Sequence, residues 1–343
     1  MQFGIFDHLD DSGVPLTEHF ENRLRLMEAY DRGGFRSYHM AEHHGTPLGF
    51  APSPAVFLSA AAQRTRRLRF GPLVFLLPLY HPLRLIEEIC MLDQMSGGRL
   101  ELGIGRGASP IEVGLFGVES SEAMARYQET LEIVLQGLRC DELTYNGKFY
   151  WLDRVPMVMK PVQRPHPPLW YGISNPGTSV WAAANNVNVI GLLPAPVLRR
   201  INDRYRAEWG RLGKAEAELP FLGASRHMVL AETDADARAA ACHAYPAWRT
   251  NMERLWKQRG VPFPLDLPNA FDDYQRAGFG FAGTAAGARD YIREQVATAR
   301  INYLVCGVAF GTLPLGAALR TADLLAREVI PAFAEDTRVT DAG

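Results

Sequence analysis

Strand-like and helix-like patterns alternate eight times along this chain of 343 residues. The strand-like segments are short apolar runs, and the segments between them carry apolar residues every three or four positions. The expected strands are residues 3–6, 36–40, 68–77, 99–105, 169–173, 188–192, 221–230 and 303–308. The expected helices are residues 17–32, 54–64, 82–95, 121–140, 178–186, 196–212, 234–259 and 314–330, with a further helix at 285–299. Eight such units favour an α/β fold of the TIM (β/α)8 barrel type over an open doubly wound sheet.

No shift in composition marks a domain boundary, so we expect a single barrel domain over residues 1–335. Residues 141–168 contain an Asn-Gly turn and interrupt the alternation, which predicts a hairpin excursion before the fifth strand. Residues 260–283 are rich in Pro, Gly and Phe without clear periodicity, which predicts an active-site lid before the eighth strand. Residues 336–343 are expected to form a disordered tail.

Composition and charge exclude several classes of partner. Hydrophobic residues make up 47% of the chain, charged residues 22%, and the formal net charge is -2, as in an ordinary globular protein. There is no concentrated basic face for nucleic acid and no apolar run that could span a membrane. The four cysteines have neither close pairing nor metal-ligand spacing, and the chain opens directly on a strand rather than on a targeting segment. We therefore expect a cytoplasmic protein that binds no metal.

Glu42, His43 and His44 follow the second expected strand, where a TIM barrel places its active site. Neighbouring side chains on a strand point in opposite directions, so two adjacent histidines rarely bind one metal ion. The sequence has no His-Glu-x-x-His spacing and no cluster of carboxylates besides Glu42. A histidine here acts either as a structural hydrogen-bonding residue or as a general base, and both interpretations remain open.

A glycine-rich stretch ends the fourth expected strand, with Gly103, Gly105 and Gly107 around Arg106. Glycines at alternate positions allow a large planar or phosphorylated ligand to approach the backbone, and Arg106 suits a phosphate group. The alternative is a strand that needs small residues for packing. The string also fits G-x-G-x-x-[G/A], but three strand–helix units precede it and Pro110 follows, so a Rossmann site is unlikely in this context.

The loop after the fifth expected strand contains Ser174, Asn175, Gly177 and Thr178 and opens a helix. Free backbone N–H groups and hydroxyls at a helix N-terminus form an anion site. Plain N-capping needs the same residue types. Arg106 follows the preceding strand of the barrel, so we favour a phosphate that both elements share.

Eight short motifs run from the first residue to the last helix: MQFGIF (1–6), AEHH (41–44), LLP (76–78), HP (81–82), LDQMSGGR (92–99), GIGRG (103–107), WAA (181–183) and VIP (329–331). Together they resemble the motifs of the bacterial luciferase-like, flavin-dependent monooxygenases. The run LDQMSGGR is the specific one, and the others are individually short.

The resemblance implies a TIM barrel that binds FMN at the mouth, with Arg106 and the loop 174–178 on the flavin phosphate. It implies that His43 is the catalytic histidine, with His44 beside it, and that Glu112 lies near the flavin. It also implies a cis peptide bond between Leu73 and Val74 at the site. Luciferase has a reactive cysteine where this chain has Gly105, so we do not expect light emission.

Three functions share such a barrel. The favoured one is a two-component monooxygenase of the EC 1.14 class, in which a separate flavin reductase supplies reduced FMN and O₂ oxidises a small apolar organic substrate. An oxidoreductase that uses the deazaflavin F420 and a non-catalytic flavin-binding protein are the alternatives. Relatives imply a homodimer, and we expect helices 54–64 and 82–95 at its interface.

The water-excluding pocket of such an enzyme is expected to be apolar. Its expected lining is Phe6, Phe50, Phe75, Leu76 and Phe310, with Leu193 against the flavin.

Overall fold

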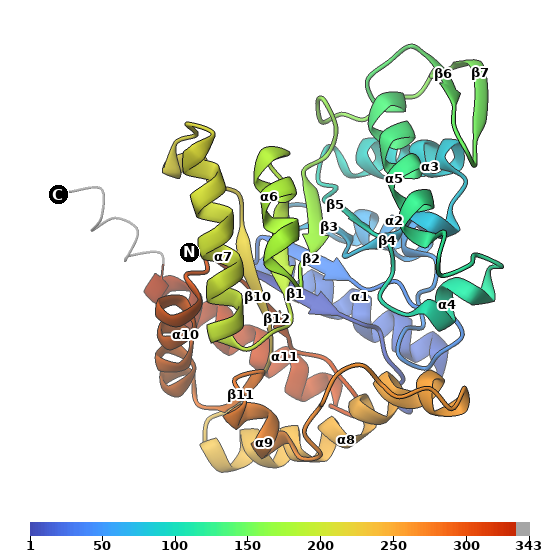
Figure 1. Cartoon of the computed structure of the whole chain (residues 1–343). Coiled ribbons are helices and arrows are strands. Elements are labelled where there is room, and N and C mark those ends of the chain that lie inside the picture. The colour runs from blue at the N-terminus through green and yellow to red at the C-terminus, as the bar shows by residue number, and fades with distance from the viewer. Residues whose placement is uncertain (334–343) are drawn as a thin grey trace.

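A parallel β-barrel with helices around it forms the centre of the computed structural model, which describes residues 1–333 (Figure 1). The barrel strands are β1 (Gln2–Asp7), β2 (Ser37–Met40), β3 (Arg69–Pro72), β4 (Phe75–Leu76), β5 (Leu102–Gly105), β8 (Leu169–Gly172), β9 (Asn188–Gly191), β10 (Leu222–Leu230) and β12 (Tyr303–Gly307). Neighbouring strands pair in parallel in the order β3-β2-β1-β12-β10-β9-β8-β5-β4. A parallel bridge between Phe70 of β3 and Leu100, just before β5, links the first strand of this order to the other side, so the barrel closes as the alternation predicted.

The helices follow the strands in the expected positions. They are α1 (Leu16–Arg32), α2 (Pro54–Arg64), α3 (Pro82–Ser96), α4 (Pro110–Leu115), α5 (Ala123–Gly137), α6 (Pro176–Ala184), α7 (Ala195–Arg211), α8 (Asp234–Gln258), α9 (Phe271–Arg276), α10 (Ala285–Ala299) and α11 (Leu315–Leu324), the last continued by a π-helical turn over Leu325–Val329. Short 3-10 turns occupy Leu77–Leu79 and Glu216–Glu218.

Local chemistry explains why the boundaries of several helices could be predicted. Pro54 and Pro82 stand in the first turns of α2 and α3, where a missing N–H costs nothing. Gly97 ends α3 with a φ of 67°, a left-handed conformation that glycine adopts without a steric penalty. Thr284 caps α10 by accepting a hydrogen bond from the backbone N–H of Gly287.

The third strand is the main departure from the expected pattern. The sequence predicts one strand over residues 68–77, whereas the structure divides it into β3 and β4. The peptide bond between Leu73 and Val74 is cis, as the family resemblance implied, and it falls between the two pieces. β3 pairs with β2, and β4 pairs with β5, so both pieces still occupy one barrel position.

Two segments lie outside the regular alternation. The strands β6 (Glu142–Asn146) and β7 (Trp151–Pro156) form an antiparallel hairpin, which projects from one edge of the molecule in Figure 1. The segment 260–283 is more ordered than its composition suggests, because it contains α9 and the strand β11 (Gly280–Gly283). β11 pairs in parallel with the second half of β10, so residues 260–270 and 277–279 remain without helix or strand.

Side chains fill the inside of the barrel. An apolar cluster there consists of Phe6, Ala41, Leu73, Trp170, Ile190, Tyr303 and Val305. Below this cluster the fully buried Glu101 accepts a hydrogen bond from the Trp170 indole and pairs with Arg69 and Arg36. The interior is therefore a packed core rather than a channel, and a ligand must enter from the mouth.

The four cysteines are free thiols, and Cys90 and Cys306 are buried in the core. No helix in the described part of the chain is long and apolar enough to cross a membrane. The predicted tail at 336–343 lies outside the described residues.

Candidate active site

His43 and Glu112 meet at the mouth of the barrel from different elements. His43 lies in the loop after β2, and Glu112 lies in the first turn of α4, where Ser109 Oγ caps the helix by accepting from its backbone N–H. His43 Nδ1 is 3.2 Å from both carboxylate oxygens of Glu112, and the backbone N–H of His44 donates to the same carboxylate at 2.9 Å. Glu112 therefore fixes the orientation of the His43 ring and leaves Nε2 for the mouth.

His44 is bound to a second carboxylate. Its Nε2 lies 2.8 Å from Glu42, whose other oxygen accepts hydrogen bonds from the Leu76 backbone and the Tyr80 hydroxyl. The His44 ring also packs edge-on against Phe116. The His43 side chain is 21% exposed and that of His44 is 14% exposed, so the His43 imidazole is the more accessible of the two.

The two carboxyl groups differ in acidity. Burial alone would raise the pKa of Glu112, but the hydrogen bonds from His43 and the His44 backbone lower it below the usual value. Burial raises the pKa of Glu42, and the hydrogen bonds from His44, Leu76 and Tyr80 oppose this shift only in part. Glu112 is thus the carboxylate that stays ionised beside the imidazole of His43.

The glycines of β5 serve strand packing, which was the alternative interpretation of this stretch. A methyl group at Gly103 would lie closer than 3.0 Å to the Pro72 carbonyl oxygen, and one at Gly105 would lie equally close to Val74. Real carbon atoms do not approach so closely. The space beside Gly105 is occupied by Val74, next to the cis bond to Leu73, and the approach of a ligand to the backbone at Gly105 stays a prediction.

Gly107 and Arg106 face a different environment. Gly107 has a φ of 94°, which disfavours any other residue. Arg106 is exposed and makes no ion pair or hydrogen bond with any described residue, but its charge lowers the pKa of Tyr171 against the raising effect of burial. The guanidinium therefore lies toward β8, the neighbour of β5 in the barrel.

The loop after β8 carries the predicted anion-binding residues. Asn175 is the N-cap of α6: its side-chain oxygen accepts from the Thr178 backbone N–H at 3.1 Å and from the Thr178 hydroxyl at 3.3 Å. Ser174, Asn175 and Gly177 are exposed. N-capping is therefore present here. Pro176 has no N–H and the Thr178 N–H is bound to Asn175, so the Gly177 N–H is the group of the first turn that remains for an anion.

An apolar groove of about 570 Å³ begins at this loop and runs between α5 and α6. Three aromatic side chains line it: Tyr127 of α5, Tyr171 of β8 and Trp181 of α6. Nothing in the sequence indicated that Tyr127 and Tyr171 lie in a groove, and Trp181 appeared there only as part of a family motif. The Tyr127 hydroxyl is buried without a hydrogen-bond partner among the described residues. Asn175, Gly177 and Thr178 form one end of the groove.

The structure separates the residues that were expected to line the substrate pocket. Phe6 and Phe310 lie beside histidine rings at the mouth, 4.8 Å from His8 and 4.3 Å from His227 between ring centroids. Phe50 instead packs on His19 of α1. Phe75 has no exposed surface and packs on Tyr80 in the core around the barrel, so it does not face the mouth.

Leu76 and Leu193 contribute backbone groups to the site. The Leu76 N–H donates to Glu42, and the Leu193 carbonyl accepts from the buried Arg226 at 3.0 Å. Leu193 is half-buried beside the mouth-facing end of β9.

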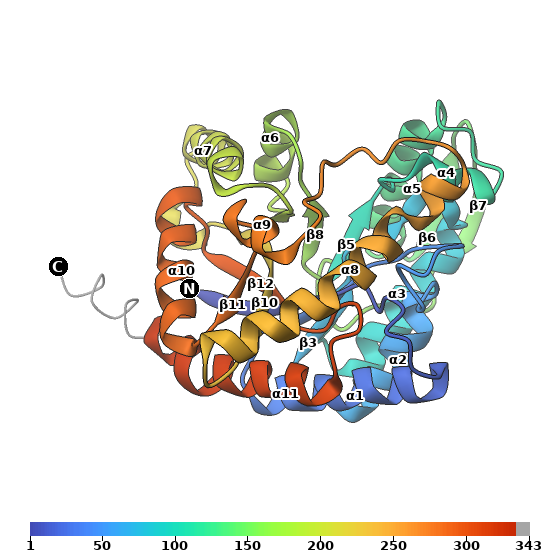
Figure 2. The same cartoon turned by 90° about the horizontal axis from the view of Figure 1, so that it is seen from below.

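Three aromatic residues at the mouth escaped the sequence reasoning. His8 follows β1, His227 lies on β10, and Trp248 lies on α8. The His8 ring stacks on His43 at 5.7 Å, and Trp248 lies 6.1 Å from His8 and 4.5 Å from His227. Of the three, only His8 could have been placed at the mouth from the sequence, because it directly follows a strand. Trp248 could not, because α8 crosses the barrel from a distant part of the chain (Figure 2).

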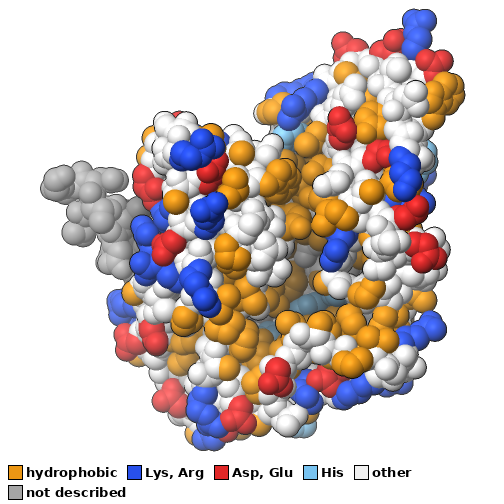
Figure 3. Space-filling view, in the orientation of Figure 1, with side chains coloured by type: hydrophobic (Ala, Val, Ile, Leu, Met, Phe, Trp, Pro, Cys, Tyr) orange, Lys and Arg blue, Asp and Glu red, His pale blue; other side chains and the backbone are white. Residues whose placement is uncertain are grey.

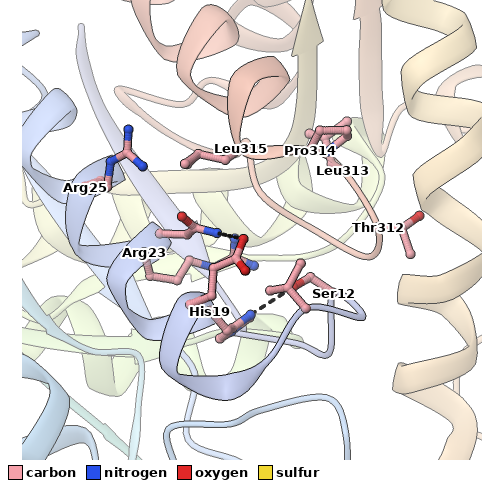
Figure 4. Close-up of a pocket in the computed structure, with 11 residues that line it drawn as sticks. Ser12, His19, Arg23, Arg25, Thr312, Leu313, Pro314 and Leu315 are labelled. Carbon is pink, nitrogen blue, oxygen red and sulfur yellow. Dashed lines mark hydrogen bonds between the residues drawn. The ribbon is translucent and has the colours of Figure 1, made fainter.

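A second hollow of about 400 Å³ lies away from these residues, between the start of α1 and the loop before α11 (Figure 4). There His19 Nδ1 lies 3.0 Å from the Ser12 hydroxyl. Arg23 lies behind them and pairs with Asp7. None of the predicted site residues lines this hollow. Within residues 1–333, no three His, Cys, Asp or Glu side chains are grouped as a metal site would require.

A closed parallel barrel with a histidine–carboxylate pair at the carboxyl ends of its strands belongs to the class of TIM-barrel enzymes. The model of the luciferase-like monooxygenase family matches residues 1–303, and the chain belongs to that family. It is accordingly an enzyme of the flavin-dependent monooxygenase type.

Two relatives illustrate this membership. An uncharacterized Sinorhizobium fredii protein, y4wF, is 46% identical over 330 residues, which cover 96% of either chain. The oxygenase component of the flavin-dependent trigonelline monooxygenase of Acinetobacter baylyi is 27% identical over 280 residues, which cover 77% of this chain and 76% of that protein.

Solved structures share the fold. The monooxygenase RslO1 from Streptomyces bottropensis has a TM-score of 0.84 at 28% identity, covering 97% of this chain and 100% of that one. Two others are 20% identical and show the fold alone. The oxygenating constituent of 3,6-diketocamphane monooxygenase from Pseudomonas putida, in complex with FMN, has a TM-score of 0.79 and covers 96% of this chain and 98% of that one. The coenzyme F420-dependent tetrahydromethanopterin reductase from Methanopyrus kandleri has a TM-score of 0.73 and covers 97% and 99%.

Proposed function

We propose that this protein is the oxygenase component of a two-component system, which uses FMN reduced by a separate flavin reductase, and O₂, to oxidise a small apolar organic substrate. The observation that carries the proposal is the His43–Glu112 pair, held at the same mouth as the unpaired Arg106 and the start of α6. The description of the Acinetobacter relative as an oxygenase component supports the two-component arrangement.

The residues at the mouth fit a flavin phosphate. Arg106 offers a planar set of donors without a competing carboxylate in the described chain, and the first turn of α6 offers the N–H of Gly177. Ser174 and Thr178 add hydroxyl groups at the same end. Leu73, Val74, Gly105, Gly107 and Leu193 would stand beside the flavin. When bound, the reduced flavin supplies the electrons that activate O₂.

The chain's own residues bind, shield and move protons. His43 Nε2 makes no hydrogen bond with any described residue, so it is the atom that accepts or donates a proton at the reacting centre. Glu112 holds Nδ1, which keeps the ring in one orientation and one tautomer. His44 and Glu42 position the loop that carries His43. Phe6 and Phe310 keep the centre dry, and residues 261–270 are proposed as the remaining part of the lid.

The proposed homodimer uses α2 and α3. Both helices leave large apolar side chains exposed on the outer surface, with Val56 on α2 and Met91 and Met95 on α3. Met91 and Met95 are four residues apart and so share one face of the helix. Apolar side chains gathered on one face favour a protein partner, here a second copy of this chain.

The test mixes the anaerobic protein with reduced FMN and then with ¹⁸O₂ and an organic substrate set, followed by absorbance and mass spectrometry. Incorporation of ¹⁸O into a product, together with flavin reoxidation that differs from that of free flavin, supports the proposal. Reoxidation identical to free flavin with no labelled product contradicts it. Tight binding and hydride transfer to F420 would instead favour the deazaflavin alternative, for which the Methanopyrus structure is a precedent in fold.

A further inference from the structure

A wall of histidine and aromatic rings stands beside the proposed catalytic pair. The His8 ring lies between His43 and Trp248, and the His227 ring packs on Trp248 and Phe310. These residues come from the loop after β1, from β10, from α8 and from the loop after β12, so the fold brings them together at one side of the mouth. Figure 3 shows histidine side chains at the bottom of a hollow with apolar walls.

The two histidines of this wall retain unused hydrogen-bonding atoms. His8 is 8% exposed, and neither of its ring nitrogens bonds to any residue in the described part of the chain. His227 is also 8% exposed; its Nδ1 lies 3.0 Å from the Tyr274 hydroxyl, and its Nε2 has no partner among residues 1–333. These nitrogens are not fully buried, so water can reach them, and a ligand that displaces this water removes the hydrogen bonds that it provides. A ligand with a polar atom at this place would restore them.

The wall is polar but carries no charge. Burial lowers the pKa of His8 well below its ordinary value, and the nearby His43 and His227 lower it further; burial lowers the pKa of His227 to about 3. No Lys or Arg of the described chain makes an ion pair or hydrogen bond with either ring. Carboxyl groups of the adjoining segments are already engaged: Glu112 with His43, Asp7 with Arg23, and Asp10 with Asn251 and Gly311. An anionic ligand would find no cation here, and a wholly apolar one would leave the imidazole nitrogens unpaired.

We propose that His8, assisted by His227, selects an uncharged substrate that carries a hydroxyl or carbonyl oxygen, and holds that oxygen beside His43. The inference rests on the proposed function and narrows its apolar substrate to a molecule with one neutral polar group. The His8 and His43 rings are stacked with their centroids 5.7 Å apart, so an oxygen bonded to His8 would lie on the same side of the mouth as the catalytic imidazole. His8 is thereby a positioning residue, whereas His43 handles the proton.

Three probes of nearly equal size test this without any turnover: phenol, toluene and the benzoate anion. Their dissociation constants are measured by calorimetry on the full chain, first without flavin and then with oxidised FMN. We expect phenol to bind at least about tenfold more tightly than toluene, since a site that hydrogen-bonds an oxygen rejects the analogue that lacks it. Benzoate should bind more weakly than phenol.

Three variants test whether His8 causes the preference for phenol over toluene. His8→Phe should reduce the phenol-to-toluene ratio to about one, and His8→Gln, which keeps a hydrogen-bonding group, should retain part of it. His243→Phe, at an exposed histidine of the same helix as Trp248, is the matched control and should keep the wild-type ratio. Imidazole NMR signals of His8 should shift with phenol and not with toluene.

Equal affinity for phenol and toluene, tighter binding of benzoate, or an unchanged ratio in His8→Phe would overturn the inference. These binding measurements need neither oxygen nor reduced flavin. The proposal for His8 can therefore fail while the monooxygenase proposal stands, and the reverse also holds.

Discussion

His43 Nδ1 lies 3.2 Å from both oxygens of Glu112, although 69 residues separate the two side chains in the sequence. Helix α4 brings Glu112 to the loop after β2, and the backbone N–H of His44 secures the same carboxylate. The neighbouring imidazole of His44 is instead tied to Glu42. The two adjacent histidines therefore have different partners, and this difference favours His43 as the general base.

Exchange of each histidine for glutamine tests that assignment. His43→Gln should lower kcat by about 10²–10⁴-fold, the usual contribution of a general acid or base. His44→Gln should lower kcat by about tenfold or less, since its role is to anchor a loop through a hydrogen bond. Product formation is measured under saturating reduced FMN. Equal losses in both variants would contradict the division of roles.

Arg106→Leu tests the phosphate site. A charge-assisted hydrogen bond contributes about 1.5–3 kcal/mol, so the dissociation constant for FMN should rise about 10- to 100-fold. Riboflavin lacks the phosphate, and its affinity should be unchanged in the variant. Fluorescence quenching of the two flavins measures both constants. Arg154→Leu, on the exposed β6–β7 hairpin, is the control and should alter neither. A parallel loss of riboflavin binding would place Arg106 elsewhere on the cofactor.

Gly105→Ala tests the packing of β5 against Val74. The added methyl group would overlap Val74, so we expect a loss of about 1–3 kcal/mol in the free energy of unfolding, measured by urea titration. Val74→Ala removes the overlapping atoms, so the double variant should recover part of this loss. Gly114→Ala is a control, because no atom lies within 4 Å of a methyl group there. If Gly105→Ala impairs flavin binding at unchanged stability, the glycine serves the ligand after all.

Asp10 makes stability depend on pH. Its Oδ2 accepts from Asn251 and Gly311, but its Oδ1 is buried without a partner among the described residues. Burial raises the pKa of this carboxyl from 3.8 to about 7. Between these values the folded state binds more protons than the unfolded state, so the free energy of unfolding falls as pH rises, by up to about 4 kcal/mol at pH 7 and above.

Asp10→Asn should remove this dependence. The amide oxygen can take the place of Oδ2 and keep both hydrogen bonds, while the NH₂ group takes the place of the unpaired oxygen. We expect the variant to be more stable than the wild type at pH 8 and similar to it at pH 4–5, as measured by chemical denaturation. Asp153→Asn, at an exposed site, should change neither value. A variant less stable at pH 8 would show that Asp10 is ionised in the fold and that its charge is stabilising.

The dimer proposal is tested at an exposed apolar face. Val56 is 72% exposed on α2, and Met91 lies exposed on α3, which packs on α2. Val56→Glu with Met91→Glu should convert a dimer into a monomer in light scattering, since charges are disfavoured in the core of an interface. Val158→Glu, 89% exposed after the hairpin, is the control. A wild-type chain that is already monomeric at high concentration would contradict the dimer proposal.

The architecture followed from the order of local patterns in the sequence. Alternating apolar strands and amphipathic helices predicted the barrel, and a helix such as α2 could be bounded at Pro54 because capping and proline effects act within one turn. The ends of the strands then placed His43, Arg106 and the loop after β8 on one side of the molecule. These inferences succeed because they depend on neighbours in the chain.

Contacts between segments that are distant in the sequence could be identified only from the tertiary structure. The division of the third strand into β3 and β4 and the pairing of β11 with β10 depend on sheet neighbours that no local pattern shows. Glu112 reaches His43 across 69 residues, and Trp248 joins His8 to His227 from a helix late in the chain. The sequence by itself determined the barrel and the strand ends that carry His43, Arg106 and the loop after β8, but not His8, His227 or Trp248. Only packing decided which of them meet, because the partner of a side chain depends on how helices cross strands.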